Sequence, residues 1–289
     1  MPSLNALRAF EAVARLKSIS AAANELFVTP AAISQHVKAL EAWAGEKLIK
    51  RNPQGIELSP LGANALNDFK LAFDQLGTAV QKLRIAAAPF EIRIAALPSV
   101  AQIWLSPRLP EIRKTMPDVS VSVSALENPP NLIREPFDLA IFYGTEELVA
   151  NNIVINQDII YPVCSPLIAE RLKSVDDLKN EIFLHDTTWK QDWDIWLSNA
   201  VPGKIFSKSG PEFSLYSLAL EECKNGAGVL IGHEDLVAEQ VKNGDLVAPF
   251  GTRVNTGRNL EISTIKPLEA GSTLKTVISK LLNTNGNPA

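Results

Sequence analysis

Cysteine, histidine and long apolar runs are the features that this chain has little of. Its 289 residues include 2 Cys and 3 His, which argues against a disulfide framework and against a Cys/His zinc site. No run of about 18 apolar residues occurs, so no transmembrane helix is expected. The first residues include the acidic Glu11 and lack an apolar core, so no signal peptide is expected either. These absences predict a cytoplasmic protein with reduced thiols.

The short motifs of common catalytic sites are also absent from the sequence. It contains no G-x-S-x-G, no P-loop and no pair of histidines at metal-ligand spacing. The glycine-rich segment 226–228 follows a helical pattern and precedes an apolar run, which is the reverse of a dinucleotide fingerprint and predicts a helix end. His185-Asp186 has no second ligand at metal spacing, and His36 and His233 are interpreted as structural or solvated. We therefore predict no enzyme, no catalytic residue, no metal and no cofactor.

What the chain does have is an ordinary globular composition with an uneven distribution of charge. Hydrophobic residues make up 46% and charged residues 21% of the chain, as in soluble globular proteins. Residues 1–88 carry 10 Lys and Arg against 7 Asp and Glu, whereas the remaining residues carry 18 against 25. A mildly basic N-terminal part on an acidic body fits a protein that holds DNA by one end.

The stretch from residue 18 to residue 41 predicts two short helices joined by a tight turn. Ser18 is placed to cap the first helix, and Thr29 followed by Pro30 is the start signal of the second. Apolar residues then recur at spacings of four and three, which predicts one buried stripe: Ile33, Val37 and Leu40. The opposite face carries small and hydrogen-bonding side chains that suit a helix lying in the major groove. The predicted DNA contacts of this helix are Thr29, Pro30, Ala31, Ser34, Gln35 and Lys38.

Residues 48–58 predict a small two-stranded wing that turns at residues 52–55. Basic residues flank the turn: Lys47, Lys50 and Arg51. Exposed cations on a wing can contact phosphates and so position the protein without reading sequence. The alternative interpretation is a solvated basic turn, and beside a helix-turn-helix we favour phosphate contact by Lys50 and Arg51.

A second cap-and-proline signal, Ser59-Pro60, predicts a long helix that ends near residues 86–89. Its apolar residues are spaced alternately by three and four: Leu66, Phe69, Phe73, Leu76, Val80 and Leu83. Such a seam must be buried, either on the helix's own domain or against a partner. Because the preceding domain is small and has a core of its own, we expect the seam to form a dimer, which would present two recognition helices to a two-fold-related DNA site.

From residue 90 onward strand-like and helical segments alternate, which predicts an α/β fold with parallel sheets. A helix is expected over residues 99–113, and a closing helix over residues 273–282. The expected strands of the last 130 residues include IFLHD, KIFSK, VLIG, LVAPF and RNLEISTIKP.

The chain resembles the LysR-type transcriptional regulators, in their glycine-cleavage-activator-like branch. The N-terminal resemblance rests on LNALRAFEAVARLKSISAAANELFVTPAAISQHVKALEAWAGEKLIKR and LSPLGANAL, with Leu48-Ile49 where the family usually has Leu-Phe. The C-terminal resemblance rests on FDLAIFYG, LHDTTWKQDWDIW and SLALEECKNGAGVLIGHEDLVAEQVKNGDLVAPF. It implies a winged helix-turn-helix over residues 1–59, a linker and dimerisation helix over 60–88 and a two-lobed effector domain over 89–289, similar to periplasmic binding proteins. Lobe I would comprise about 90–160 and 258–289, and lobe II about 161–257.

In α/β sheets, ligands bind beyond the carboxyl ends of strands, near helix N-termini. The family's inter-lobe cleft is built from the equivalents of such segments, and the predicted effector contacts are Ser99, Val100, Tyr143, Gly144, Trp189, Ser214 and Ser217. Each serine taken singly is more readily explained as a helix cap. Trp189, Trp193 and Trp196 fit one packed helix face, with Trp189 as a possible aromatic wall because it precedes the helix.

The sequence and the resemblance together predict a regulator with a double-stranded DNA operator, RNA polymerase and a small-molecule effector as partners, as a homodimer or homotetramer. One alternative is a redox-responsive regulator that uses Cys164 and Cys223, although Glu221 and Glu222 would disfavour a thiolate. Another is a ligand-independent regulator of the same fold. A solute-binding protein is disfavoured by the N-terminal DNA-binding pattern.

Overall fold

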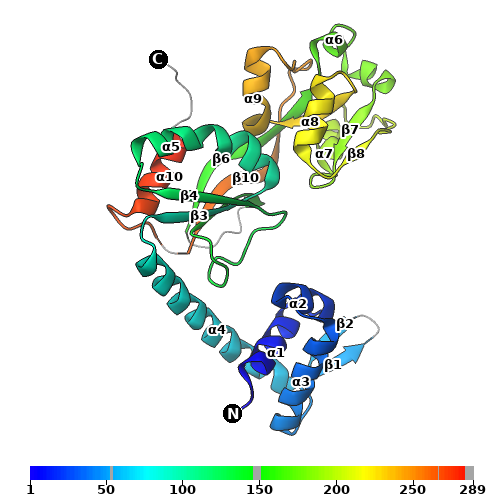
Figure 1. Ribbon diagram of the computed structural model, residues 1–289. Helices are drawn as coiled ribbons and strands as arrows, with labels where there is room; N and C mark the ends of the chain where they lie inside the picture. Colours follow the sequence, from blue (N-terminus) through cyan, green and yellow to red (C-terminus); the bar gives the residue numbers. More distant parts are fainter. Residues whose placement is uncertain (53–54, 146–150, 266, 284–289) are drawn as a thin grey trace. The chain divides into compact units, whose positions relative to one another are not determined.

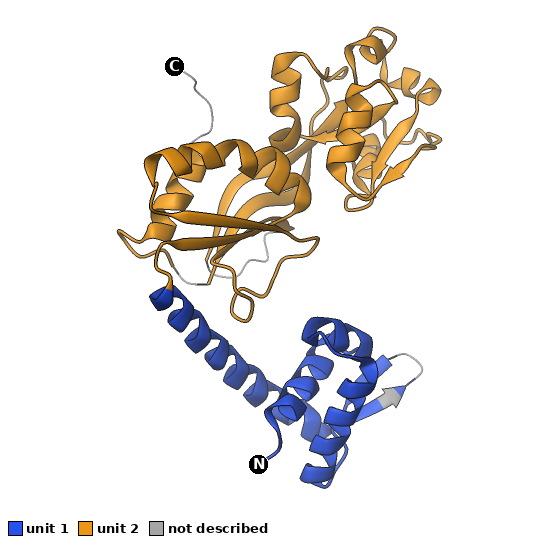
Figure 2. Ribbon diagram, viewed as in Figure 1, with its two compact units in different colours: residues 1–87 blue, residues 88–289 orange. Residues whose placement is uncertain are grey.

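The computed structural model describes residues 1–52, 55–145, 151–265 and 267–283, apart from the side chains of Arg51 and Thr145. It divides into two compact units, residues 1–87 and residues 88–289 (Figures 1 and 2). None of the helices in these ranges combines the length and the apolar character needed to cross a bilayer.

The first unit begins with three helices, α1 (Leu4–Leu16), α2 (Ile19–Leu26) and α3 (Pro30–Ala44). Their start signals were predicted correctly, since the Ser18 hydroxyl accepts a hydrogen bond from the amide of Ala21 and the Thr29 hydroxyl accepts one from the amide of Ala32, both at 3.2 Å. Phe27 ends α2 in the left-handed conformation, with φ of 55°. This tight turn fixes the direction of α3 relative to α2.

The core of the first unit lies between α1 and α3. The predicted stripe of Ile33, Val37 and Leu40 is buried, and it belongs to one cluster with Phe10 and Val13 of α1. Because all the apolar residues of α3 that form the stripe point inward, its opposite face is left to solvent.

A buried carboxylate fixes the wing to α3. The wing consists of β1 (Ile49–Asn52) and β2 (Gly55–Leu58), which pair antiparallel. Glu41 of α3 accepts hydrogen bonds from the amides of Leu48 (3.0 Å) and Ile49 (3.3 Å) and from Lys47 Nζ (2.8 Å). Burial opposes its charge, but these hydrogen bonds prevail and lower the pKa of the Glu41 carboxyl.

Helix α4 (Pro60–Ala87) begins where the Ser59 hydroxyl accepts the amide of Gly62 at 3.0 Å. A side chain at Gly62 would collide with the wing, because its Cβ would lie 2.2 Å from the Leu48 carbonyl oxygen. The glycine therefore lets α4 pass close to β1.

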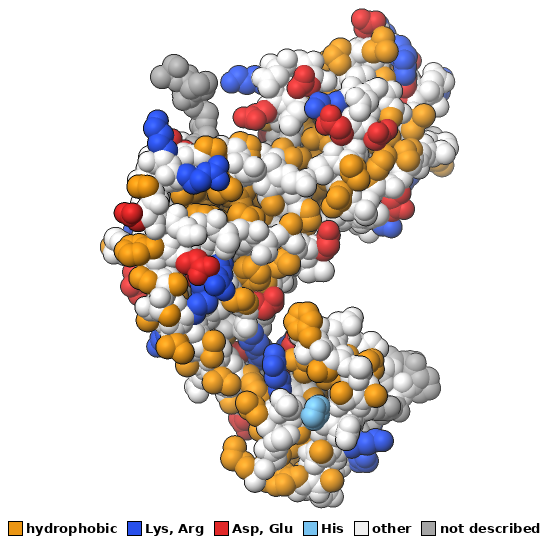
Figure 3. Space-filling view, viewed as in Figure 1, with side chains coloured by type: hydrophobic (Ala, Val, Ile, Leu, Met, Phe, Trp, Pro, Cys, Tyr) orange, Lys and Arg blue, Asp and Glu red, His pale blue; other side chains and the backbone are white. Residues whose placement is uncertain are grey.

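The apolar seam of α4 is divided between two environments, which corrects the expectation that all of it faces a partner. Leu66 and Phe69 pack on the core of the first unit, and the Phe69 ring lies 5.9 Å from that of Phe10. The later residues are exposed: Leu76 by 48%, Val80 by 57% and Leu83 by 72%. Figure 3 shows hydrophobic side chains recurring along this helix. The first part of the seam anchors α4 to its own domain because α1 offers an aromatic partner there.

The second unit contains one continuous eight-stranded sheet in the order β4-β3-β5-β10-β6-β9-β7-β8. Its strands are β3 (Glu91–Ala96), β4 (Ser120–Ala125), β5 (Leu139–Thr145), β6 (Asn152–Val163), β7 (Phe183–Asp186), β8 (Glu212–Phe213), β9 (Val229–His233) and β10 (Val254–Thr264). Pairing is parallel within each end of the sheet but antiparallel at β5–β10, β10–β6 and β6–β9. The prediction of parallel sheets was therefore wrong for the centre, where two long strands cross between the lobes in opposite directions (Figure 1).

Helices cover both lobes, and several boundaries differ from the predictions. They are η1 (Val100–Leu105), η2 (Ser106–Arg108), α5 (Leu109–Thr115), α6 (Pro166–Ala169), η3 (Val175–Asn180), α7 (Asp192–Ala200), α8 (Tyr216–Lys224), α9 (Glu234–Asn243) and α10 (Thr273–Asn283). The single helix expected over 99–113 is a π-helical turn, a 3-10 turn and an α-helix in succession. KIFSK is not a strand, and LVAPF contributes only an isolated bridge between Val247 and Cys164.

A buried cluster of opposite charges ties the crossover strands to lobe II. Arg258 of β10 donates to both carboxylate oxygens of Asp192 on α7 (2.9 and 2.8 Å) and, through Nε, to Asp158 of β6 (2.9 Å). His233, at the end of β9, lies with Nδ1 2.8 Å from Asp158 and Nε2 3.2 Å from Asp192. Thr256 also donates to Asp158 at 2.8 Å. The cluster lies beside an irregularity in the β6–β10 register, where Gly257 has φ of 79°.

Both ring nitrogens of His233 lie close to carboxylate oxygens, an arrangement that favours the protonated imidazolium form of the ring. Burial opposes this charge, but Asp158 and Asp192 prevail and raise the pKa of His233 above 6.5. Burial likewise opposes the charge on Asp158, yet His233 and Arg258 lower the pKa of that carboxyl below 3.8. The charged forms of His233 and Asp158 are thus stabilised by the opposite charges beside them.

This arrangement predicts a specific dependence of stability on pH. The contribution of His233 is fully present below its ordinary pKa and is lost as pH rises through the raised value, whereas that of Asp158 is lost as pH falls through its lowered value. The unfolding free energy of the second unit should therefore decrease in the natural protein as the pH rises above 6.5 and through the raised pKa of His233. We would measure the unfolding free energy by denaturant unfolding at several pH values. Above neutral pH it should decrease much less in His233→Gln than in the natural protein. The matched control, His36→Gln on α3, should keep the natural slope, and equal slopes in all three proteins would contradict the prediction.

Candidate DNA-binding surface and effector site

The outer face of α3 is the candidate base-reading surface. Thr29, Pro30, Ala31, Gln35 and Lys38 are exposed. Ser34 is half-buried, and its hydroxyl donates to the carbonyl oxygen of Pro30 at 3.0 Å. Small residues at the start of the helix with an amide and an ammonium one turn later would let the backbone approach a groove while Gln35 and Lys38 reach further.

The wing supplies the basic residues of this surface. Lys50 is exposed on β1. The side chain of Arg51 lies outside the described part of the structure, as do the turn residues 53–54. Lys47, which was not among the predicted contacts, forms an ion pair with Glu41 through its ammonium group at 2.8 Å. Lys47 therefore supports the fold of the wing, while Lys50 is available for a phosphate.

A hollow at the carboxyl edge of the sheet brings together two of the predicted effector residues. Its lining consists of Leu97, Pro98, Ser99, Glu127, Thr188, Ser214, Leu215 and Tyr216. Ser99 does not cap a helix, because it has helical dihedral angles itself and its hydroxyl makes no capping bond. That hydroxyl is buried, with the residue only 4% exposed, and it has no hydrogen-bond partner among the described residues. Buried hydroxyls without a partner are uncommon, and a ligand would satisfy this one.

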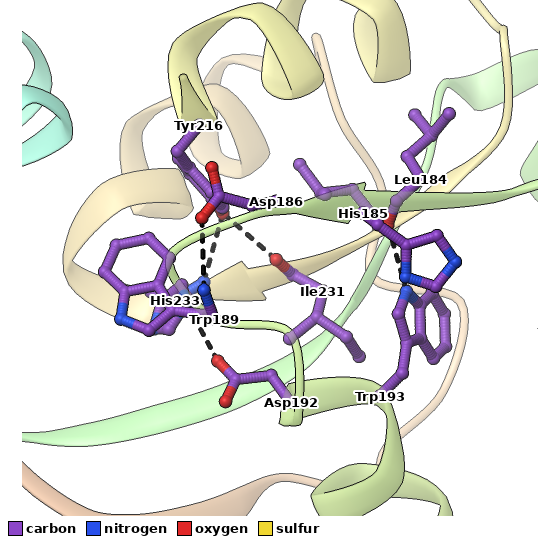
Figure 4. Close-up of a pocket in the computed structure, with 10 residues that line it drawn as sticks. Leu184, His185, Asp186, Trp189, Asp192, Trp193, Tyr216, Ile231 and His233 are labelled. Atoms are coloured by element: carbon purple, nitrogen blue, oxygen red, sulfur yellow. Dashed lines mark hydrogen bonds and ion pairs between the residues drawn. The ribbon is translucent and has the colours of Figure 1, made fainter. Parts of the chain in front are cut away.

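Tyr216 also lines a second hollow, together with Asp186, Trp189, Asp192 and His233 (Figure 4). Trp189 precedes α7 and packs edge-on against Tyr143 (5.5 Å) and Tyr216 (5.2 Å), with its ring 3.9 Å from that of His233. Trp193 and Trp196 belong instead to the separate core of lobe II. The three tryptophans therefore do not share one packed face, because the helix starts only after Trp189.

The remaining predicted effector residues lie in other environments. Val100 is fully buried in the core, so its side chain is not available to an effector. Gly144 faces the carboxylate of Glu261, 3.3 Å from an ideal Cβ position. Tyr143 lies in the aromatic cluster, where burial raises the pKa of its hydroxyl, and that hydroxyl has no partner among the described residues. Ser217 lies within α8 and does not line either hollow.

The two cysteines have the chemistry of structural thiols. Both are buried and unpaired, and burial raises the pKa of each to about 12. Cys223 Sγ donates to the carbonyl oxygen of Val163 at 3.2 Å. A redox sensor needs a thiolate that solvent can reach, so this environment disfavours the redox alternative. Within the described ranges, no group of three or more His, Cys, Asp and Glu is arranged to hold a metal ion.

Sequence reasoning missed the charged residues beneath the aromatic cluster. It did not single out Asp158, Asp192 or Arg258, and it treated His233 as structural or solvated. The only signal was local: Asp158 interrupts the apolar segment that forms β6, and Arg258 follows the glycine at which β10 is irregular. Nothing in the sequence indicated that residues 158, 192, 233 and 258 would meet.

Comparison with known families places both units. Residues 4–63 match the family described as "Bacterial regulatory helix-turn-helix protein, lysR family". Residues 90–265 match the family described as "LysR substrate binding domain". Together these matches span most of the chain, and they join a DNA-binding module to a small-molecule-binding module.

Individual proteins agree with these assignments. The chain is similar to the glycine cleavage system transcriptional activator of Escherichia coli strain K12, with 34% identity over 261 residues, 86% of this chain and 83% of that protein. Among solved structures, the effector domain of the transcriptional regulator AmpR of Pseudomonas aeruginosa has 22% identity and a TM-score of 0.55, covering 67% of this chain and 93% of that one. The full-length Vibrio cholerae virulence activator AphB has 16% identity and a TM-score of 0.53, covering 97% and 99%. The two structures show the fold.

The predicted architecture is confirmed by these matches: a winged helix-turn-helix, a linker helix and a two-lobed α/β effector domain. The prediction that the chain is not an enzyme is confirmed as well, because both modules belong to transcriptional regulators. This chain belongs to the LysR family of bacterial transcriptional regulators.

Proposed function

We propose that this regulator reads a two-fold-related operator with paired α3 helices and that a small molecule bound between its lobes controls its activity. The observation that carries the ligand-controlled part is the buried hydroxyl of Ser99, which has no hydrogen-bond partner among the described residues and lies in the hollow that Ser214 also lines. The α8 N-terminus contributes to the same hollow through Leu215 and Tyr216. Polar groups that converge in a hollow without partners are typical of a ligand site.

In this proposal the effector acts by favouring one arrangement of the lobes and of the assembled subunits. A ligand can shift such an equilibrium only by the difference in its affinity for the two states. The exposed half of the α4 seam would pair with that of a second copy, as a dimer or within a tetramer. The regulator would act in the cytoplasm, through altered DNA binding or bending and contact with RNA polymerase.

The first experiment is a footprint and salt titration on the DNA directly upstream of the regulator's own gene. A protected, two-fold-related site bound far more tightly than random DNA would support the proposal. Binding that is equally strong on random DNA would show phosphate attraction alone.

Gln35→Ala tests whether α3 reads bases. The amide of Gln35 can pair with both hydrogen-bonding groups of an adenine edge, so its loss should weaken operator binding by about 1–3 kcal/mol per half-site. The loss should concentrate at one base position in each half-site when operator variants are compared. Lys50→Ala is the control, because a phosphate contact should weaken all sequences alike and reduce the salt dependence. A uniform loss in Gln35→Ala would make Gln35 a backbone contact.

Substitution of the exposed seam tests the oligomer. Val80→Glu together with Leu83→Glu places charges where apolar side chains are now exposed, so folding of the subunit should be preserved while self-association is lost. Sedimentation should show a shift to monomers, accompanied by weaker operator binding. Lys82→Glu on the same helix is the control for added negative charge. An unchanged assembly in the double variant would place the interface elsewhere.

Ser99→Ala tests the effector hollow. The hydroxyl makes no described hydrogen bond, so its removal should leave unfolding without ligand unchanged or slightly more favourable to the folded state. In a metabolite screen by thermal unfolding, a compound that stabilises the natural protein should bind the variant about 3- to 10-fold more weakly. Ser217→Ala is the matched control. Equal affinity in all three proteins would remove Ser99 from the site.

A further inference from the structure

The hollow beneath Trp189 has the size of a single small group. Its lining includes Asp186, Trp189, Asp192, Tyr216 and His233 (Figure 4), and it offers about 10 Å³ of free space. A volume of this order accommodates about one water molecule. A group that enters must therefore be as compact as a water or an ammonium head.

One carboxylate oxygen of Asp186 has no hydrogen-bond partner in the part of the chain that the structure describes. Asp186 is 6% exposed, and its Oδ1 accepts the amides of Thr188 (2.7 Å) and Trp189 (3.2 Å). Its Oδ2 is buried and receives no hydrogen bond from any described group. Burial raises the pKa of the Asp186 carboxyl, although Thr188, Trp189 and the nearby His233 partly oppose the change. A buried carboxylate oxygen that accepts no hydrogen bond lowers the stability of the folded state.

The charged groups that line or adjoin the hollow include one more carboxylate than cations. Three carboxylates, those of Asp158, Asp186 and Asp192, face two cations, Arg258 and His233. Both ring nitrogens of His233 are directed at Asp158 and Asp192, and Arg258 is directed at the same two carboxylates. Neither Lys nor Arg is among the residues lining either hollow. Asp186 is thus the carboxylate that the cluster does not neutralise.

The other walls also suit a positive charge. The rings of Trp189 and Tyr216 lie 5.2 Å apart at 80°, and both line the hollow beside Asp186. Aromatic surfaces attract cations, and more strongly where water is excluded. The other hollow, lined by Ser99 and Ser214, shares Tyr216 with this one and offers hydrogen-bonding groups to the rest of a ligand.

We propose that the effector carries a primary ammonium group, which enters the hollow beside Asp186 and donates to its Oδ2. The remainder of the effector extends past Tyr216 toward Ser99 and Ser214. Primary amines fit because the ammonium head is water-sized and has three donors, whereas a quaternary ammonium is too bulky and has none. The inference rests on the proposed ligand-regulated function and specifies the chemical class of its ligand.

The test compares methylammonium chloride with tetramethylammonium chloride at equal concentration and neutral pH, using the full chain. Methylammonium should raise the thermal unfolding midpoint of the natural protein above that in tetramethylammonium. The difference should vanish in Asp186→Asn and persist in Asp176→Asn, a matched change at a carboxylate exposed in lobe II. Asparagine retains the oxygen that accepts the amides of Thr188 and Trp189, and it removes the buried charge. The variant without ligand should therefore unfold at the same temperature or higher, which a purely structural Asp186 would not allow.

A second comparison uses any effector found by screening, together with its N-acetylated and deaminated analogues. The amine should bind the natural protein about 10- to 100-fold more tightly than either analogue and than it binds Asp186→Asn. An identical response to the two salts in the natural protein would overturn the ammonium assignment, whether or not the variant folds. Compounds without an amine that stabilise the natural protein and Asp186→Asn equally would overturn it too, while leaving the ligand-regulated function intact. If no compound of either class stabilised the protein, the ligand-regulated function itself would fail.

Discussion

The charged groups of Asp158, Asp192, His233 and Arg258 connect the crossover strands of the effector domain to lobe II. Two strands cross between the lobes there, and β10 is irregular beside the cluster. Breaking one member would leave an uncompensated buried charge, which costs far more than an exposed ion pair contributes. The charged cluster therefore joins the crossover strands to lobe II at the place where the β6–β10 pairing is irregular.

The aromatic cluster around Trp189 packs directly against these charged residues. His233 is held by two carboxylates on one side, and its ring packs against Trp189 on the other. Trp189 in turn contacts Tyr143 of lobe I and Tyr216 of lobe II. A ligand that displaced Trp189 would push against His233. Because His233 is held by Asp158 and Asp192, its displacement would disturb both carboxylates. If the proposed effector binds here, this continuity would be a physical route for coupling its binding to the geometry of the crossover.

The DNA-binding unit depends on a different kind of anchor. Glu41 joins the recognition helix to the wing through two backbone amides, and Gly62 lets α4 pass close to β1. Phe69 then fixes the beginning of α4 to α1. The helix α3, the wing and the beginning of α4 are thus packed into one unit. In the proposed dimer, a change in how two α4 helices pair would therefore be transmitted to both α3 helices.

The sequence by itself determined the elements whose cause is local. Cap residues such as Thr29 with Pro30, and the stripe of Ile33, Val37 and Leu40, depend on neighbours within one or two helical turns, so α3 and its exposed face could be predicted. The family could be predicted for the same reason, because its residues are contiguous in the chain. Tertiary structure alone decided the direction of the central strands and the division of the α4 seam. It also decided that Ser99 Oγ and Asp186 Oδ2 find no hydrogen-bond partner among the described residues. Each of these features depends on contacts between groups far apart in the sequence, as between Asp158 and Arg258. Periodicity and spacing describe neighbours along the chain, so they do not predict which distant groups come into contact.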